Sequence, residues 1–141
     1  MAEVDVITIN DGEARQLAEE PNLVKAVRKI AALGPRTVVV KRGEYGALLL
    51  DDGAFFVVPA YPLESVFDPT GAGDTFAGGF MGYLASRDRT DSATVRRAMV
   101  YGSVMASFTV EDFSLRRLTR LGPADIAERY AAFYELIRLE P

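Results

Sequence analysis

The sequence predicts an α/β fold in which a mostly parallel sheet carries an antiparallel hairpin and is flanked by helices. Short, continuous apolar runs such as Val4–Asn10 are typical of strands buried on both faces. Segments with helical spacing lie between and after these runs. Asp52 and Gly53 join two further apolar runs and predict a hairpin turn. We expect one domain over residues 1–141, because this length suits a single core.

The N-terminal half is predicted to form a strand, two helices and a second strand. The first strand is Val4–Asn10, and Asp11 is a candidate N-cap for the helix that follows. Gly34 is the expected C-cap of the second helix. The run RTVVVKRG (36–43) predicts another buried strand, and a strand–helix–strand order implies that the two strands are parallel.

The C-terminal half is predicted to be helical. The segment Asp74–Ser86 is apolar almost all round, so we expect this helix to lie in the interior. Two more helices are expected to begin at Ser92 and at Pro123. No linker or internal repeat separates these elements.

Composition excludes several kinds of chemistry. The chain has no cysteine and no histidine, which leaves carboxylates, lysine or tyrosine for acid and base work. Its net charge of -4 argues against nucleic acid or an anionic membrane surface as a partner. The apolar runs are too short to span a bilayer, and the start does not resemble a secretory leader. The expected compartment is the cytoplasm.

The stretch DPTGAGDTFAGGF (68–80) contains four glycines where a loop turns into a helix. It is not a P-loop, because that motif requires Gly-Lys-Ser/Thr after four intervening residues. A dinucleotide fingerprint requires glycine at the sixth position from Gly71, where this chain has Phe76. Both common glycine motifs therefore fail.

Backbone amides at a helix N-terminus offer another interpretation of this stretch. Successive amides of Gly71, Ala72 and Gly73 would bind an anion at a helix that begins near Asp74. Asp74 is then either an ordinary N-cap or a base that accepts a proton from a substrate hydroxyl. Three later glycines are expected to permit close helix packing: Gly78, Gly79 and Gly82.

The segment DPTGAGDTFAGGFMGYL closely resembles the C-terminal signature of the ribokinase-like (PfkB) carbohydrate and nucleoside kinase family. NDGE (10–13) resembles the family's Asn-x-x-Glu element, and VVKRGEYGALL (39–49) resembles its Gly-x-x-Gly turn and hairpin. The resemblance implies an ATP-dependent kinase that transfers the γ-phosphate to an alcohol group of a sugar. A nucleoside kinase and a non-catalytic nucleotide-binding or assembly module are the alternatives.

At the glycine stretch, the resemblance implies that Asp74 is the general base and that the amides of Gly71–Gly73 form the anion hole. It also implies that Asp68 and Thr70 lie where many family members bind an activating monovalent cation such as K⁺.

Upstream, the resemblance implies that Asn10 and Glu13 organise Mg²⁺ through water, and that Lys41 and Gly43 flank the ATP phosphates and ribose. Taken alone, Asn10 would be a strand terminator and Glu13 a carboxylate in the first turn of a helix. Lys41 and Arg42 stand where many members have threonine and a small or apolar residue, so an ammonium group would contact phosphate here.

Two features depart from the family pattern. Glu111–Ser114 replaces a Gly-Ala turn near the adenine, so no adenine-contacting residue is predicted. The N-terminal half of the family fold, with its Gly-Gly motif and β lid, is absent, which implies a partial domain. Because that half holds most of the acceptor, we expect little activity from this chain alone. We also expect the edge strand Val4–Ile9 to pair with another copy.

Overall fold

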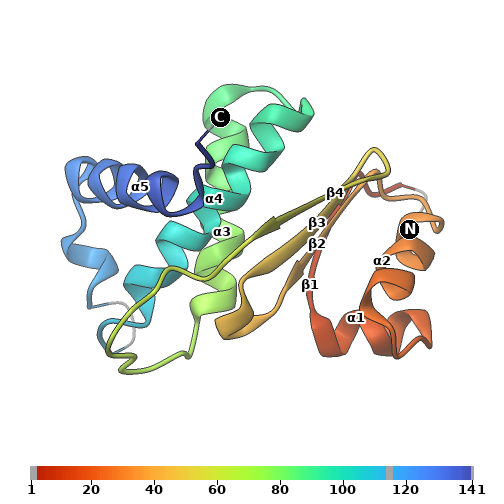
Figure 1. Ribbon diagram of the computed structural model, residues 1–141, viewed down its shortest axis with the longest axis horizontal. Coiled ribbons are helices and arrows are strands. Elements are labelled where there is room, and N and C mark those ends of the chain that lie inside the picture. Colours follow the sequence, from red (N-terminus) through yellow and green to blue (C-terminus); the bar gives the residue numbers. More distant parts are fainter. Residues whose placement is uncertain (1–2, 114–115, 141) are drawn as a thin grey trace. The chain divides into compact units, whose positions relative to one another are not determined.

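The computed structural model describes residues 3–113 and 116–140. They form two compact units, one that ends at Pro59 and one that begins at Ala60 (Figure 1). The first unit contains a sheet and two helices, and the second contains three longer helices. A single partial domain over residues 1–141 stays a prediction.

The first unit is a four-stranded sheet with strand order β1-β2-β3-β4. β1 and β2 are parallel, whereas β2–β3 and β3–β4 are antiparallel. The predicted α/β class and hairpin are confirmed, although the parallel share is lower than expected, at one pairing of three. The elements of this unit are β1 (Val6–Asn10), α1 (Asp11–Ala18), α2 (Leu23–Ala31), β2 (Thr37–Lys41), the 3₁₀ turn η1 (Gly43–Tyr45), β3 (Ala47–Asp51) and β4 (Ala54–Val58).

The core of the first unit lies between the sheet and its two helices. β2 and β3 are the middle strands, which explains why their sequences are continuous apolar runs. Figure 1 shows α1 and α2 on the same face of the sheet. The fully or nearly buried side chains of this core are Ala14, Val27, Ile30, Val38, Val40, Leu48 and Leu50.

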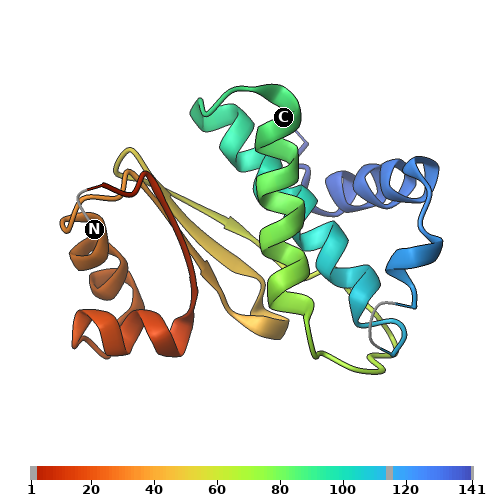
Figure 2. The same cartoon turned by 180° about the vertical axis from the view of Figure 1, so that it is seen from behind.

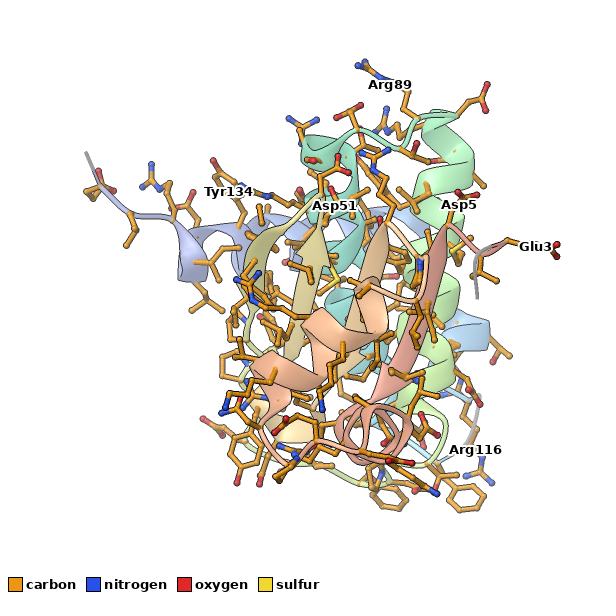
Figure 3. The ribbon with its side chains drawn as sticks, turned by 90° about the vertical axis from the view of Figure 1, so that its right-hand side faces the viewer. Glu3, Asp5, Asp51, Arg89, Arg116 and Tyr134 are labelled. Atoms are coloured by element: carbon orange, nitrogen blue, oxygen red, sulfur yellow. The ribbon has the colours of Figure 1, made fainter. Side chains whose placement is uncertain are left out.

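The hairpin turn has the geometry that its sequence predicts. Asp52 and Gly53 both have positive φ, at 46° and 79°, as a two-residue type I′ turn requires. Next to the turn lies Asp51, which Figure 3 labels and which is only 3% exposed. Its Oδ1 accepts a hydrogen bond of 2.7 Å from Thr37 Oγ1. Arg36 Nε lies 3.9 Å from the same oxygen, so the buried carboxylate at the end of β3 has both a hydrogen-bond donor and a positive charge beside it.

The second unit consists of α3 (Ala72–Arg87), α4 (Ser92–Thr109), the 3₁₀ turn η2 (Leu118–Arg120) and α5 (Pro123–Ile137). The predicted helix starts at Ser92 and Pro123 are confirmed. α3 and α4 lie side by side and run in opposite directions (Figure 2). None of the helices in the described part of the chain is long and apolar enough to cross a membrane.

Close packing of α3 against α4 depends on one glycine from each helix. A Cβ at Gly79 would lie 2.9 Å from Met105 Cγ, and a Cβ at Gly102 would lie 2.9 Å from the carbonyl oxygen of Phe76. At Gly78 and Gly82 a Cβ would meet no atom within 4 Å. The packing explanation is therefore confirmed for Gly79 and is wrong for Gly78 and Gly82.

α3 is only partly buried, contrary to the expected interior position. Its buried residues are Phe76, Phe80 and Leu84, which recur every four positions and form one stripe. On the other side, Met81 is 49% exposed. Apolar composition alone does not show which side of a helix is covered, because burial depends on what packs against that side.

Candidate active site

The predicted site residues lie in both units. The site residues of the second unit lie at the N-terminus of α3 or in the loop before it. Gly71 is the N-cap of α3 with φ 83°, a conformation that favours glycine. Asp74 is therefore the third residue of the helix, and its interpretation as the N-cap is wrong. The first turn of any helix has amide N–H groups without helical partners, so this end can attract an anion.

Asp74 differs from the other acidic residues at the same position in a helix. Glu13 in α1 and Asp125 in α5 are also third residues, and each accepts a 2.8 Å hydrogen bond from the N-cap backbone N–H. The carboxylate of Asp74 is exposed and accepts no such bond within the described residues. The two N-caps also differ in conformation, because Gly122 of α5 has extended backbone whereas Gly71 of α3 is left-handed. Asp74 thus remains available to a ligand.

The loop before α3 forms a tight turn. Asp68 Oδ1 accepts a 2.9 Å hydrogen bond from the backbone N–H of Thr70, and this bond lowers the pKa of Asp68. The N–H of Ala72 donates to Pro69 O at 3.2 Å. Asp68 and Thr70 therefore lie together as expected, in a turn that also accounts for them without a cation. The Ala72 amide would have to be shared between Pro69 O and an anion.

Two threonines hold this turn in place, and sequence reasoning missed both. Thr75 Oγ1 donates to Gly71 O at 3.0 Å, and Thr109 Oγ1 donates to Thr75 Oγ1 at 2.9 Å. Thr109 is buried at the end of α4. No local signal marks these residues, because 34 positions separate them in the chain.

Asn10 and Lys41 end neighbouring parallel strands of the first unit. They are partners in the β1–β2 register, so both lie at the end of the sheet where these two strands finish. Asn10 and Glu13 form a reciprocal capping box, in which Glu13 N–H donates to Asn10 Oδ1 at 2.7 Å and Asn10 N–H donates to Glu13 Oε2 at 2.8 Å. Lys41 is half-buried and makes contacts of its own. The structure thus brings three of the predicted residues together.

The capping box limits how Asn10 and Glu13 could bind Mg²⁺. Glu13 Oε1 has no hydrogen-bond partner in the described part of the chain, and both side chains are exposed. Across residues 3–113 and 116–140, no group of three acidic side chains could hold a metal directly. Mg²⁺ commonly keeps several waters and binds few protein oxygens, so this pair fits a contact through water.

The turn after Lys41 places two glycines in conformations that other residues avoid. Gly43 has φ 56° and is exposed, and Gly46 has φ 81°. Arg42 N–H donates to Gly46 O at 2.8 Å and closes the turn. Gly43 is thus an accessible stretch of backbone beside Lys41, as the nucleotide-binding prediction requires.

Glu111, in the segment that departs from the family pattern, is occupied by ion pairs. Its Oε1 lies 2.6 Å from Arg129 Nη2, and its Oε2 lies 3.4 Å from Arg117 Nε. The contact with Arg129 joins the segment after α4 to α5, and the contact with Arg117 joins it to the residue before η2. Ser114, the last residue of the segment, lies outside the described residues.

Comparisons with known proteins agree on one family. Cytidine kinase from Thermococcus kodakarensis is 39% identical over 90 residues, which are 62% of this chain and 32% of that protein. Ribokinase from Haemophilus influenzae is 32% identical over 95 residues, or 64% and 31% of the two chains. The chain thus spans about a third of the length of these relatives.

Solved structures extend the similarity to the fold. Aminoimidazole riboside kinase from Salmonella enterica, solved with aminoimidazole riboside and an ATP analog, superposes with a TM-score of 0.80 and 26% identity. The match covers 92% of this chain and 43% of that one. Residues 1–119 also match the model of the pfkB family carbohydrate kinases. The chain therefore belongs to the pfkB family of carbohydrate kinases.

Proposed function

We propose that this chain supplies the phosphate-binding and catalytic-base part of an ATP-dependent kinase that phosphorylates an alcohol group of a sugar. The observation that carries the proposal is the carboxylate of Asp74, which lies exposed in the first turn of α3 and is not used as a cap. A nucleoside acceptor is the second candidate, because the relative at 39% identity is a cytidine kinase.

In the proposed reaction, Asp74 accepts the proton of the acceptor hydroxyl as the hydroxyl oxygen attacks the γ-phosphorus of ATP. The bond between the γ-phosphorus and the bridging oxygen breaks, and ADP leaves with that oxygen. Amides of Gly71–Gly73 stabilise the negative charge on the transferring group. An activating K⁺ at Asp68 and Thr70 belongs to the same proposal.

Nucleotide phosphates would be held by residues of the first unit. Mg²⁺ would neutralise charge on the phosphates, and Glu13 and Asn10 would orient its waters. Lys41 would contribute a positive charge, and the exposed backbone of Gly43 would allow close approach. The register of Asn10 beside Lys41 supports this assignment.

Replacing Glu13 with glutamine tests the magnesium role separately from the capping role. Glutamine can complete a capping box, so the helix should be retained while the negative charge is lost. We expect ATP affinity in the presence of Mg²⁺ to fall about threefold to tenfold, and affinity without Mg²⁺ to stay unchanged. Isothermal titration calorimetry of the chain with ATP, with and without Mg²⁺, measures both values.

Asp125→Asn is the matched control, because Asp125 occupies the same position in α5 and caps its helix in the same way. Equal effects of the two substitutions would contradict a magnesium role for Glu13. Absence of any ATP binding by the unsubstituted chain would contradict the nucleotide site itself.

We also propose that two copies of the chain associate through β1. β1 is at an edge of the sheet, and edge strands readily pair with other chains. Sedimentation velocity at micromolar concentration is expected to show a dimer, and Val6→Lys is expected to shift it toward monomer. A monomer at all concentrations would contradict this proposal.

A further inference from the structure

Residues of the three helices of the second unit line a half-open cavity at the end of α3 that lies away from Asp74. Its volume is about 400 Å³, which is within the range of small-ligand sites. Arg87 is the last residue of α3, 13 positions after Asp74, so roughly 20 Å of helix separates the two. We name this space the tyrosine–arginine cavity after its lining residues Tyr83, Arg87, Arg89, Arg97, Tyr101 and Tyr130.

Three tyrosines, one from each helix, form a continuous stack along the cavity. The ring centroids of Tyr83 and Tyr101 are 4.4 Å apart, as are those of Tyr101 and Tyr130. Both faces of Tyr101 are thereby covered, so it meets the cavity with its edge and hydroxyl group. Burial raises the pKa of Tyr130, and the neighbouring Tyr101 and Tyr83 raise it further. Its phenol therefore stays protonated near neutral pH and can donate a hydrogen bond.

The lining of the cavity is strongly positive on a chain whose net charge is -4. Arg89 pairs with Asp91 at 3.0 Å, whereas Arg87 and Arg97 form no ion pair within the described residues. No acidic side chain lines the space. Arg89 marks this end of the second unit in Figure 3.

A stabilising interaction with its own helix accounts for the position of Arg87 but not for that of Arg97. Arg87 lies in the last turn of α3 and over the ring of Tyr83 at 5.2 Å, where a positive charge is favoured by the helix dipole. Arg97 is the sixth residue of α4, far from the C-terminus of that helix. Its guanidinium is exposed, carries five N–H donors and forms no ion pair within the described residues, while the nearby carboxylate of Asp91 is paired with Arg89.

We propose that the tyrosine–arginine cavity binds a small polyanion that carries at least two phosphoryl groups. Guanidinium groups match phosphate oxygens in geometry and charge, and the phenol hydroxyls supply further donors. The cavity is half open and of limited volume, about 400 Å³, which suits a small molecule better than an extended polymer, and the overall negative charge of the chain disfavours nucleic acid. This inference does not rest on the proposed kinase function.

Titration with sodium pyrophosphate tests the proposal. Three of the six tyrosines line the cavity and the chain has no tryptophan, so tyrosine emission reports on this space. We expect a saturable change in emission at low ionic strength. Arg97→Gln is expected to weaken binding about tenfold, and Tyr101→Phe, which keeps the stacked ring, about threefold.

Arg120→Gln is the matched control, because it removes one positive charge from the same unit outside the cavity. We expect it to weaken binding less than about twofold. Equal losses for Arg97→Gln and Arg120→Gln would overturn the proposal, because they would indicate general charge attraction. So would the absence of saturation below about 10 mM pyrophosphate, which corresponds to negligible affinity.

Competition with an oligothymidylate tests whether the cavity binds a small polyanion or a nucleic acid. We expect pyrophosphate to bind without competition from the oligonucleotide. Displacement of pyrophosphate by a lower concentration of oligonucleotide would overturn the small-molecule assignment. If pyrophosphate bound at the N-terminus of α3 instead, Arg97→Gln would not change its affinity. An unchanged affinity of this variant would therefore also contradict binding in the cavity.

Discussion

Replacing Asp74 with asparagine is expected to lower the rate of phosphoryl transfer by a factor of about 10²–10⁴ and to leave the affinity for ATP with Mg²⁺ unchanged. Asparagine keeps the size of the side chain but cannot accept the proton of the acceptor hydroxyl. Because Asp74 does not cap α3, the substitution removes no hydrogen bond of the described residues. Loss of rate would therefore come from the chemistry and not from a weakened helix.

The measurement is kcat for phosphorylation of a panel of sugars and nucleosides, with denaturation of each variant as a stability check. We expect low turnover from the 141-residue chain itself, since positioning of the acceptor contributes roughly 7–11 kcal/mol to such reactions. The kcat values of Asp74→Asn and the unsubstituted protein are therefore compared in a form of the protein with measurable kinase activity. Substantial phosphorylation by the isolated chain would contradict the expected dependence on further residues.

Asp88→Asn is the control for this substitution, because it makes the same change at the other end of α3. Asp88 has φ 50°, a conformation that asparagine also tolerates. We expect its kcat to match that of the unsubstituted protein. Retention of more than about a tenth of the rate by Asp74→Asn would rule out Asp74 as the general base.

Replacing Gly46 with alanine is expected to lower the free energy of unfolding by about 3 kcal/mol or more. A Cβ at this position would lie 2.1 Å from the carbonyl oxygen of Val58 and 2.7 Å from the carbonyl carbon of Pro59. These are backbone atoms, so they cannot move aside as a flexible side chain could. The φ of 81° adds strain of its own.

Gly43→Ala separates the two contributions. Gly43 also has positive φ, at 56°, but a Cβ there would meet no atom within 4 Å. We expect a cost of about 1 kcal/mol, from backbone strain alone. Urea denaturation followed by circular dichroism measures both variants. Equal costs at Gly43 and Gly46 would show that the close approach to Val58 does not matter.

Secondary structure was largely predictable because its signals are local. The buried runs of β2 and β3, the Asp-Gly turn between β3 and β4, and the helix starts at Ser92 and Pro123 each depend on a few consecutive residues. The share of parallel pairing depends on strand order, which is a property of the whole sheet. Exposure of one side of α3 likewise depends on what packs against it.

The candidate site was predictable only as far as its motifs extend. The signature located Asp74. The sequence did not show whether Gly71 or Asp74 is the N-cap of α3, and the structure decides for Gly71, whose φ is positive. Asn10 was expected to act on magnesium or to end a strand, and the structure adds the capping box with Glu13. The tyrosine–arginine cavity combines residues from three helices, so its members could not be recognised together in the sequence.

The hydroxyl chain from Thr109 through Thr75 to Gly71 bears on how an anion would meet the glycine turn. It anchors that turn to the buried end of α4 before any ligand arrives. A glycine-rich segment without such an anchor would lose backbone entropy on binding a phosphate. Here that entropy is lost during folding, so in the proposed site the amides would be preorganised and the affinity for phosphate would depend in part on the stability of α4.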